Sequence, residues 1–377
     1  MNRRTFLHFA AAAPLPLMAT PAKWKELPEY RIVDRSGTGK ASGGLPGAFP
    51  GRYVRVHSEK VIDVPSNRID APTVQSMLSA GMRQLTGVSE DRAAWSQFIS
   101  PQDVVGIKVN CSGAPIINSN PELVSAIIGN LLSVGVTAHN IYIYDRFWNQ
   151  MRIVNFEAHI PAGVQTAAAE HSRGSILGYD PFTYVEVDFF GEEDTRSNLI
   201  RLVAEKFTKV INVPTLKEHR AAGVTGCLKN LAYGNFSNVA RSHQWAKTNT
   251  YSFIGTLASV ETLRSKTVLN VADGIRSLWH GGPFCQDPRF LFFPKEIVVG
   301  TDPVAIDNHL VDMVEERRRE EGAPSLFNRS SEHLKPGPEL DPNYNSFIRE
   351  PGHVEYASKL GLGVFDKTKV KAEVISL

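Results

Sequence analysis

The chain has 377 residues, of which 42% are hydrophobic, and this length suffices for one large domain or two modest ones. Its 41 basic and 39 acidic residues leave a formal net charge of +2, which gives no electrostatic case for binding nucleic acid or a membrane surface. No apolar run reaches the roughly 18 to 20 residues that a membrane-spanning helix needs, so we expect no membrane span in the mature chain.

Residues 1–22 have the features of an export signal rather than of a folded segment. Asn2 to Leu7 reads NRRTFL, which is similar to the twin-arginine motif, and a short, weakly hydrophobic stretch interrupted by prolines follows it. Cleavage after Ala19 or Ala22 fits this pattern, with an ordinary secretory signal as the alternative. The pattern predicts a periplasmic or otherwise exported protein that uses the twin-arginine export machinery. That route carries folded proteins, often with a metal or redox cofactor already bound.

The first part of the mature chain reads as an arm followed by helices. Residues 23–58 are rich in proline and glycine, and we expect an extended arm there. Asp70, two residues before a proline, is typical of a helix start, and apolar residues at helical spacing continue to Leu85. A second short helix is expected after Ser89. We expect residues 59–377 to form a single α/β domain.

From residue 103 onward, strand and helix patterns alternate. Apolar residues at helical spacing over positions 121–134 predict an amphipathic helix between the first two strands. The expected strands are residues 104–110, 141–145, 184–190, 209–213, 267–273 and 296–300. Further helices are expected at 199–207, 302–320 and 354–360, with a polar loop over 322–352. This alternation predicts an α/β fold with a mostly parallel sheet flanked by helices.

Polar side chains follow five of the predicted strands. They are Asn110 with Cys111, Asp145, Asn212 with the loop at Lys217 and His219, Asp273, and Thr301 with Asp302. Because ligands bind outside the carboxyl ends of the strands in open parallel sheets, we expect one site at this edge. Lys108 shares a strand face with Asn110 and is unusual in an apolar strand, so it is also a candidate. A helix N-cap role by itself would account for Asp302.

Residues 209–235 concentrate the chemically active side chains. After a buried strand that ends at a proline, two lysines, a histidine, a cysteine and an asparagine follow among three glycines. The glycines let the backbone approach a ligand closely, and the basic residues suit an anionic group such as a carboxylate or phosphate. A nearby ammonium is expected to lower the pKa of Cys227, with a small buried residue in a glycine-rich turn as the alternative.

These residues lead to a set of predicted roles. Catalysis is assigned to Lys217, His219, Lys229 and Asp145, and substrate binding to Lys108, Asn110, Asn212, Asn230 and Arg241. The candidate metal ligands are His219, Cys227, His243 and Asp273, although no close H-x-x-x-H pair is present. We expect Lys217, His219, Cys227 and Lys229 to converge in one pocket with Asn110, Asp145 and Asp273.

The chain has three cysteines, Cys111, Cys227 and Cys285, and they form no C-x-x-C pair. In an oxidising compartment two of them could form a disulfide, or all three could converge on a metal or cluster. Their spacing does not decide between these alternatives.

Several of these segments together resemble the domain-of-unknown-function 362 family. The matching segments are VGIKVN at 105–110, INVPTLKEH at 211–219, GVTGCLKN at 223–230, NVADG at 270–274, TDPVAID at 301–307 and LGLG at 360–363. The resemblance implies an α/β domain that is often associated with iron–sulfur proteins, many of which carry a ferredoxin-like module with closely spaced cysteines. This chain has no such module, so an iron–sulfur cluster here would depend on the three cysteines and a non-cysteine fourth ligand.

Three functions are consistent with these observations. The first is an exported metal- or redox-cofactor-dependent enzyme, an oxidoreductase with a small anionic or polar substrate and an electron-transfer partner. The second is an isomerase or lyase that uses lysine and histidine as an acid–base pair without a cofactor. The third is a non-catalytic periplasmic protein that binds a small ligand or a metallocofactor.

Overall fold

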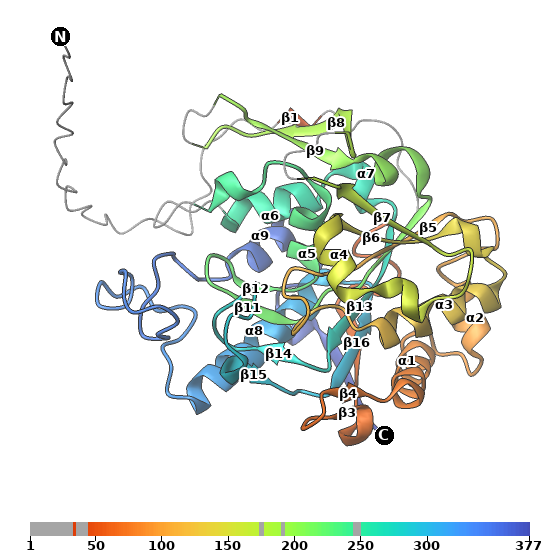
Figure 1. Cartoon of the computed structure of the whole chain (residues 1–377), viewed down its shortest axis with the longest axis horizontal. Coiled ribbons are helices and arrows are strands. Elements are labelled where there is room, and N and C mark those ends of the chain that lie inside the picture. The colour runs from red at the N-terminus through yellow and green to blue at the C-terminus, as the bar shows by residue number, and fades with distance from the viewer. Residues whose placement is uncertain (1–32, 35–43, 173–176, 190–192, 244–249) are drawn as a thin grey trace, which may run out of the picture.

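The computed structural model describes residues 33–34, 44–172, 177–189, 193–243 and 250–377 (Figure 1). The predicted export signal, and residues 23–32 and 35–43 of the predicted arm, lie outside the described residues.

An eight-stranded sheet runs through the middle of the described chain (Figure 1). Its strand order is β17 (Lys371–Ser376), β2 (Arg52–His57), β16 (Glu296–Gly300), β13 (Thr267–Gly274), β10 (Lys209–Asn212), β5 (Val105–Lys108), β6 (Ile141–Phe147) and β7 (Gln165–Glu170). Within this sheet β16 is antiparallel to both of its neighbours, and all other adjacent pairs are parallel. The predicted α/β fold with a mostly parallel sheet is therefore confirmed.

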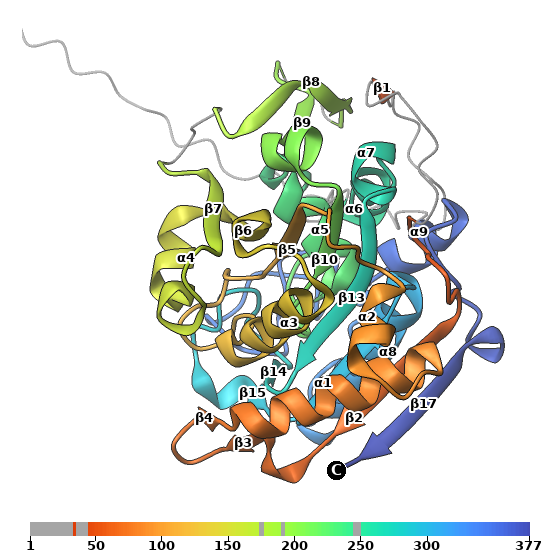
Figure 2. The same ribbon diagram turned by 90° about the vertical axis from the view of Figure 1, so that its right-hand side faces the viewer.

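Helices cover both faces of this sheet, and each face has its own apolar core (Figures 1 and 2). One face carries α1 (Ala71–Thr86), α2 (Asp91–Ser96) and α3 (Pro121–Val134), and the other carries α5 (Cys227–Asn235), α6 (Thr250–Ala258), α8 (Pro303–Glu320) and α9 (His353–Lys359). Successive strand residues point to opposite faces, so Ile211 packs with the first group while Val210 packs with the second. No helix in the described part of the chain has the length and apolar character that crossing a membrane requires.

Smaller elements extend from this core. They are helices α4 (Trp148–Val154) and α7 (Glu261–Arg264), the three-stranded sheet β1 (Val33–Asp34), β8 (Tyr179–Glu186) and β9 (Arg196–Ile200), and the hairpins β3–β4 (Ile62–Asp63, Arg68–Ile69), β11–β12 (Lys217–His219, Gly223–Thr225) and β14–β15 (Ser277–Leu278, Leu291–Phe292). The β11–β12 hairpin follows β10 directly and carries the residues on which the candidate site depends.

The starts of α1 and α8 follow from their sequences. The Asp70 carboxylate accepts a hydrogen bond from Thr73 N–H at 2.9 Å, and Asp302 accepts one from Ala305 N–H at 2.9 Å. A proline in the first turn follows each of these N-caps, as predicted. The end of α1 is set by Gly87, whose φ of 76° is the left-handed conformation that glycine adopts without strain.

The expectation that residues 301–302 lie at the same sheet edge as the other polar strand ends is wrong. Because β16 runs antiparallel to β13, its carboxyl end faces the opposite edge of the sheet. There Asp302 also accepts hydrogen bonds from Gly51 N–H at 2.8 Å and Val364 N–H at 2.9 Å. Its role is therefore to join three segments of backbone.

Three other segments differ from expectation. Residues 52–57, included in the predicted arm, form β2 inside the main sheet. The expected helix at 199–207 is instead the end of β9 followed by a π-helix at Leu202–Lys206. The loop expected after residue 213 contains the buried helix α5, because its many polar residues obscure the apolar positions that pack on the sheet.

We expect Asp302→Ala to destabilise the fold by roughly 3 kcal/mol or more, because it leaves three backbone N–H groups without an acceptor. Asp70→Ala, which removes an exposed N-cap, should lower the free energy of unfolding by about 1 kcal/mol. Urea unfolding of both variants measures the difference. Equal losses would contradict the tertiary role given to Asp302.

Candidate functional site

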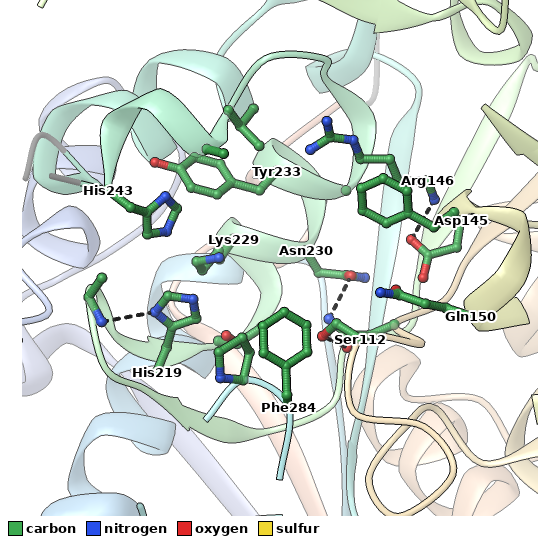
Figure 3. A pocket seen from close by; sticks show the side chains of 18 of the residues that line it. Ser112, Asp145, Arg146, Gln150, His219, Lys229, Asn230, Tyr233, His243 and Phe284 are labelled. Carbon is green, nitrogen blue, oxygen red and sulfur yellow. Dashed lines mark hydrogen bonds between the residues drawn. The ribbon is translucent and has the colours of Figure 1, made fainter. Parts of the chain in front are cut away.

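A cavity of about 390 Å³ opens beside the carboxyl ends of β5 and β6, on the face of the sheet that α5 covers (Figure 3). Aromatic and apolar side chains make up much of its wall, among them Phe147, Tyr233, Val239, Phe284 and Phe347. Its polar lining comes from five parts of the chain: the segment after β5, the end of β6 with α4, the β11–β12 hairpin, α5 and the loop after α5.

The floor behind this cavity is a row of polar residues on adjacent strands. The parallel registers pair Lys108 with Asn212, and Asn212 with Asn270, so the three lie side by side. Asn212 donates hydrogen bonds to Asn270 Oδ1 at 2.8 Å and to the Cys227 carbonyl at 3.1 Å. It accepts one from Asn230 Nδ2 at 2.8 Å, which fixes α5 over the row.

Lys108 is fully enclosed beneath α5. Its ammonium donates to the Val109 carbonyl at 2.6 Å, to Asp145 Oδ1 at 2.7 Å and to Asn230 Oδ1 at 3.3 Å, which uses all three of its N–H donors. A Cβ at Gly234 would lie 2.4 Å from Lys108 Nζ, so the close approach of α5 to this side chain requires glycine. The geometry therefore gives Lys108 a structural role in place of the predicted substrate contact.

A buried carboxylate fixes the first turn of α5. Asp307 on α8 accepts hydrogen bonds from Cys227 N–H at 2.6 Å and from Leu228 N–H at 2.9 Å. These are two of the donors that the start of a helix leaves without an intrahelical partner. Burial raises the pKa of Asp307 to about 7 despite these bonds. This cap, with the contacts of Asn230, determines where Lys229 enters the cavity.

The amide network continues from α5 to the cavity wall. Asn110 Nδ2 donates to Asn230 Oδ1 at 3.2 Å, and Asn110 Oδ1 accepts from Lys217 Nζ at 2.9 Å. Lys217 also donates to Ser112 Oγ at 3.0 Å. Burial lowers the pKa of Lys217 to about 8, and nearby Asp145 partly opposes this shift. Lys217 therefore orients the wall of the cavity through Asn110 and Ser112.

Of the three buried lysines, Lys229 has the fewest polar partners for its amino group. Among the described residues it has no hydrogen-bond acceptor and no carboxylate partner, and its neighbour is the Tyr233 ring, whose centroid lies 4.4 Å away. Burial, and then the positive charges of Lys217 and Arg146, lower its pKa to about 7. A large fraction of Lys229 is therefore a neutral amine with a free lone pair at neutral pH.

Two neutral imidazoles lie beside this amine (Figure 3). His219 Nδ1 accepts from Ala221 N–H at 3.1 Å, so its single proton is on Nε2. His243 Nδ1 lies 3.3 Å from Ser242 Oγ, which donates to the Val239 carbonyl at 2.8 Å and also contacts Tyr233 Oη at 2.5 Å. With Nδ1–H assigned as the donor to Ser242, a lone pair is left on His243 Nε2. Burial lowers the pKa of His219 well below its usual range and that of His243 to about 3. The rings, 5.4 Å apart between centroids, thus offer one donor and one acceptor.

A guanidinium on the opposite wall was not predicted from the sequence. Arg146 follows Asp145 in β6 and lines the cavity, where Nε donates to Glu170 Oε1 at 3.0 Å and to Tyr179 Oη at 2.9 Å. No acceptor for its two Nη groups occurs among the described residues. Its place directly after a strand-end aspartate was the available signal. Arg146 can therefore bind an anionic group of a ligand.

The structure brings together about half of the predicted site. Six of the predicted residues line the cavity: Asn110, Asp145, His219, Lys229, Asn230 and His243. Lys217, Lys108 and Asn212 are buried directly behind its wall. The lining also includes Arg220, one of the basic residues of the 209–235 segment that the sequence associates with an anionic group. Residues that were not predicted are Ser112, Arg146, Gln150, Tyr233 and Phe284.

Asp145 contributes to the cavity mainly by holding other groups. Its Oδ1 accepts from Lys108 Nζ at 2.7 Å and Arg146 N–H at 2.7 Å, and its Oδ2 accepts from Cys111 N–H at 2.9 Å. A carboxylate occupied in this way positions its neighbours. This geometry favours a positioning role for Asp145 over the catalytic role expected from the sequence.

Two other predicted residues lie outside the cavity. Arg241 donates to the carbonyls of Val187 and Thr195 at 2.5 and 2.8 Å, so it ties the loop after α5 to the β8–β9 sheet instead of binding a substrate. Asp273 accepts from Asn120 N–H and Nδ2, both at 2.7 Å, in a separate buried cluster. Burial raises the pKa of Asp273 to about 6.

The predicted metal site is not formed. The described residues contain no group of three or more histidine, cysteine, aspartate and glutamate side chains that could hold a metal. His219 and His243 approach one another, but Cys227 and Asp273 are held elsewhere. A neutral imidazole that binds a metal through Nε2 carries its proton on Nδ1, whereas Nδ1 of His219 accepts a hydrogen bond.

The cysteines do not fit an iron–sulfur cluster either. Cys111, Cys227 and Cys285 are buried in three different apolar clusters, and all three are free thiols. Burial raises the pKa of each thiol, that of Cys285 to about 11, and nearby Asp307 raises that of Cys227 further. The expected lowering of the Cys227 pKa is therefore wrong, because burial and a carboxylate outweigh any ammonium.

The fold and the cavity define an α/β protein with a lysine–histidine site at one edge of its sheet. A family model described as a domain of unknown function, DUF362, matches residues 105–312, which is more than half of the chain. The chain belongs to this family.

Other comparisons add little. No curated protein matches the chain. A protein of solved structure from Thermotoga maritima, determined by a structural genomics consortium, is similar with 9% sequence identity and a TM-score of 0.40. The match covers 67% of this chain and 59% of the Thermotoga chain, and a likeness this distant supports no statement about function.

We expect Lys229→Met to stabilise the protein at pH 6 by at least about 2 kcal/mol, because each lowered pKa unit corresponds to roughly 1.4 kcal/mol. The folded wild type binds fewer protons than the unfolded chain between the folded pKa of about 7 and the unfolded pKa, so its stability rises with pH through that window. The advantage of the variant should therefore shrink toward pH 10.

Chemical denaturation at pH 6, 8 and 10 measures this difference. Lys60→Met, at an exposed lysine, is the matched control and should change stability by less than about 0.5 kcal/mol at each pH. A pH-independent effect of Lys229→Met would contradict the lowered pKa.

Proposed function

We propose that the protein is an exported enzyme that transfers protons on a small anionic or polar substrate, with Lys229, His219 and His243 as its acid–base groups. The observation that carries this proposal is an uncompensated amine, with a pKa of about 7, beside two neutral imidazoles in a largely apolar cavity. An amine with a pKa near neutrality, such as that of Lys229, is an effective general base, and burial at functional sites commonly produces one. The lowered pKa values of His219 and His243 keep both rings neutral at pH 7, so each retains one N–H donor and one lone pair.

Each group would have a distinct task. Arg146 would hold the anionic group of the substrate, and the aromatic wall would exclude water. His243 Nε2 has the lone pair that removes a proton from carbon, and His219 Nε2–H donates to the oxygen on which charge develops. Lys229 would serve as a base or nucleophile in its neutral form. This corresponds to an isomerase or lyase reaction rather than to a redox reaction.

Solvent exchange tests the proposal. In D₂O, small carboxylic acids with a C–H bond next to a carbonyl should gain deuterium in the presence of the protein, as followed by NMR. His219→Asn and His243→Asn should each lower the exchange rate at least about 100-fold, the usual contribution of a general acid or base. His139→Asn, at an exposed histidine, is the matched control and should exchange at the wild-type rate.

Two outcomes would contradict the proposed proton-transfer function. If compounds bind in the cavity without any exchange, the protein is the non-catalytic binding protein that the sequence also allows. If both histidine variants keep the wild-type rate, the imidazoles have no acid–base role.

A second candidate is the cofactor-dependent oxidoreductase, with an electron-transfer partner. The observation in its favour is the volume and aromatic lining of the cavity, which suit an organic cofactor better than the available side chains suit a metal. An absorption spectrum and metal analysis of protein purified from its native compartment separate the candidates. A stoichiometric chromophore would favour the oxidoreductase, and full exchange activity without one would favour proton transfer.

We also propose export by the twin-arginine machinery. Changing Arg3 and Arg4 together to lysine should retain the chain in the cytoplasm, because that route requires the arginine pair. Cell fractionation followed by immunoblotting measures this, and Arg31→Lys provides the same chemical change outside the motif. Unchanged export of the double variant would indicate an ordinary secretory signal instead.

A further inference from the structure

The three buried lysines of the site differ in what their amino groups can do. Lys108 donates all three of its N–H groups and is ion-paired to Asp145 at 2.7 Å. Lys217 donates to Asn110 and Ser112, so its nitrogen is engaged in holding the wall. Lys229 differs from both, because no described residue accepts from or pairs with its nitrogen. Of these three amines, Lys229 is the one available to form a bond to a ligand.

The surroundings of Lys229 suit a covalent step. A large fraction of it is neutral near pH 7, and only the neutral amine is a nucleophile. The Tyr233 ring lies against the amine, and Phe284 and Phe347 line the same cavity, so the amine has largely apolar surroundings. Arg146, whose Nη groups have no acceptor among the described residues, lines the same cavity and could hold a carboxylate.

We propose that Lys229 forms an imine with the carbonyl carbon of a small oxo acid whose carboxylate binds Arg146. This rests on the proposed function and names its substrate class, a carbonyl compound with an adjacent anionic group. The aromatic wall and the cavity volume of about 390 Å³ favour a short substrate.

The chemical step needs no oxidant or reductant. The lone pair of Lys229 attacks the carbonyl carbon, a C–N bond forms, and the C=O electron pair moves to oxygen, which accepts a hydrogen bond from His219 Nε2–H and takes up the proton that the nitrogen loses, giving a carbinolamine. A second proton, from solvent, converts the hydroxyl to water; the water leaves as the nitrogen lone pair forms the C=N bond of a protonated imine, and His219 stays neutral throughout. That cation withdraws electrons from the neighbouring C–H bond, so His243 Nε2 can remove the proton. Hydration of the imine in the reverse sequence releases the product.

Reductive trapping tests this inference on the wild-type full chain. The protein is incubated with pyruvate and sodium cyanoborohydride at pH 7, and the reduced adduct is located by peptide mass spectrometry. We expect one dominant adduct at Lys229, formed at least about 100-fold faster than at exposed lysines such as Lys367, because the nucleophilic neutral amine is abundant at Lys229. Lys229→Arg, which keeps a positive charge without a nucleophilic amine, should give no adduct at this position.

The anchoring role of Arg146 is tested by comparing reagents with and without a carboxylate. Arg146→Gln should slow trapping of pyruvate by about 10-fold, because it removes a charge-assisted contact. Acetaldehyde, which has the carbonyl but no carboxylate, should be trapped equally well by the variant and the wild type. Equal slowing with both reagents would mean that Arg146 maintains the cavity instead of binding the anion.

The outcomes separate this inference from the proposed function. Proton exchange by the wild type without any adduct at Lys229, or exchange that survives Lys229→Arg, would overturn the imine and leave the histidine acid–base proposal standing. An adduct at Lys229 without exchange would support the imine and overturn the proton-transfer function. Labelling of Lys229 no faster than of Lys367 would overturn the inference outright.

Discussion

The site depends on a shortage of negative charge around buried lysines. Among the residues that the structure describes, Asp145 is the one carboxylate at the wall of the cavity, and Lys108 with two backbone N–H groups occupies both of its oxygens. Lys217 is left with neutral acceptors and Lys229 with an aromatic face. Burying a cation without a partner is costly, and a group in this position lowers its pKa instead of remaining charged. The reactive amine is thus a direct consequence of how the charges are distributed.

Several independent contacts hold helix α5, and with it Lys229, in this position. Asn212 on β10, which is hydrogen-bonded to Asn270 on β13, holds α5 against the sheet through its hydrogen bond with Asn230. Asp307 on α8 accepts hydrogen bonds from the first turn of α5. Helix α5 is buried along most of its length, so Lys229 cannot turn away to water without disrupting the core. A site held in this way keeps its groups oriented before a ligand arrives, which lowers the entropic barrier to reaction.

The sequence was most informative where local patterns determine structure. The apolar spacing of residues 121–134 and the N-cap at Asp70 were sufficient to predict α3 and α1. The polar strand ends led to Asn110 and His219, and the reactive side chains of residues 209–235 led to Lys229. The direction of β16 was not predictable, because a short apolar strand has the same pattern in either orientation, and this misplaced Asp302. The prediction of metal ligands was wrong because it also depended on tertiary structure. Cys227 and Asp273 carry suitable donor atoms, but tertiary hydrogen bonds hold them away from the two histidines. The orientation of Arg146 depends on Glu170 and Tyr179 on other strands, so its position directly after Asp145 was the available signal in the sequence. The histidine protonation sites depend on local contacts with Ala221 N–H and Ser242, whose geometry the sequence does not show.

The central claim is that Lys229 is a partly neutral amine at physiological pH, and an NMR titration measures this directly. Protein labelled with ¹³C at the lysine ε-carbon would be titrated from pH 5 to pH 11, with Lys229→Arg used to assign the resonance. The structure predicts that this resonance titrates with a pKa of about 7, several units below the resonances of exposed lysines. A Lys229 resonance that titrates above about pH 10, as an ordinary lysine does, would contradict the account of the site.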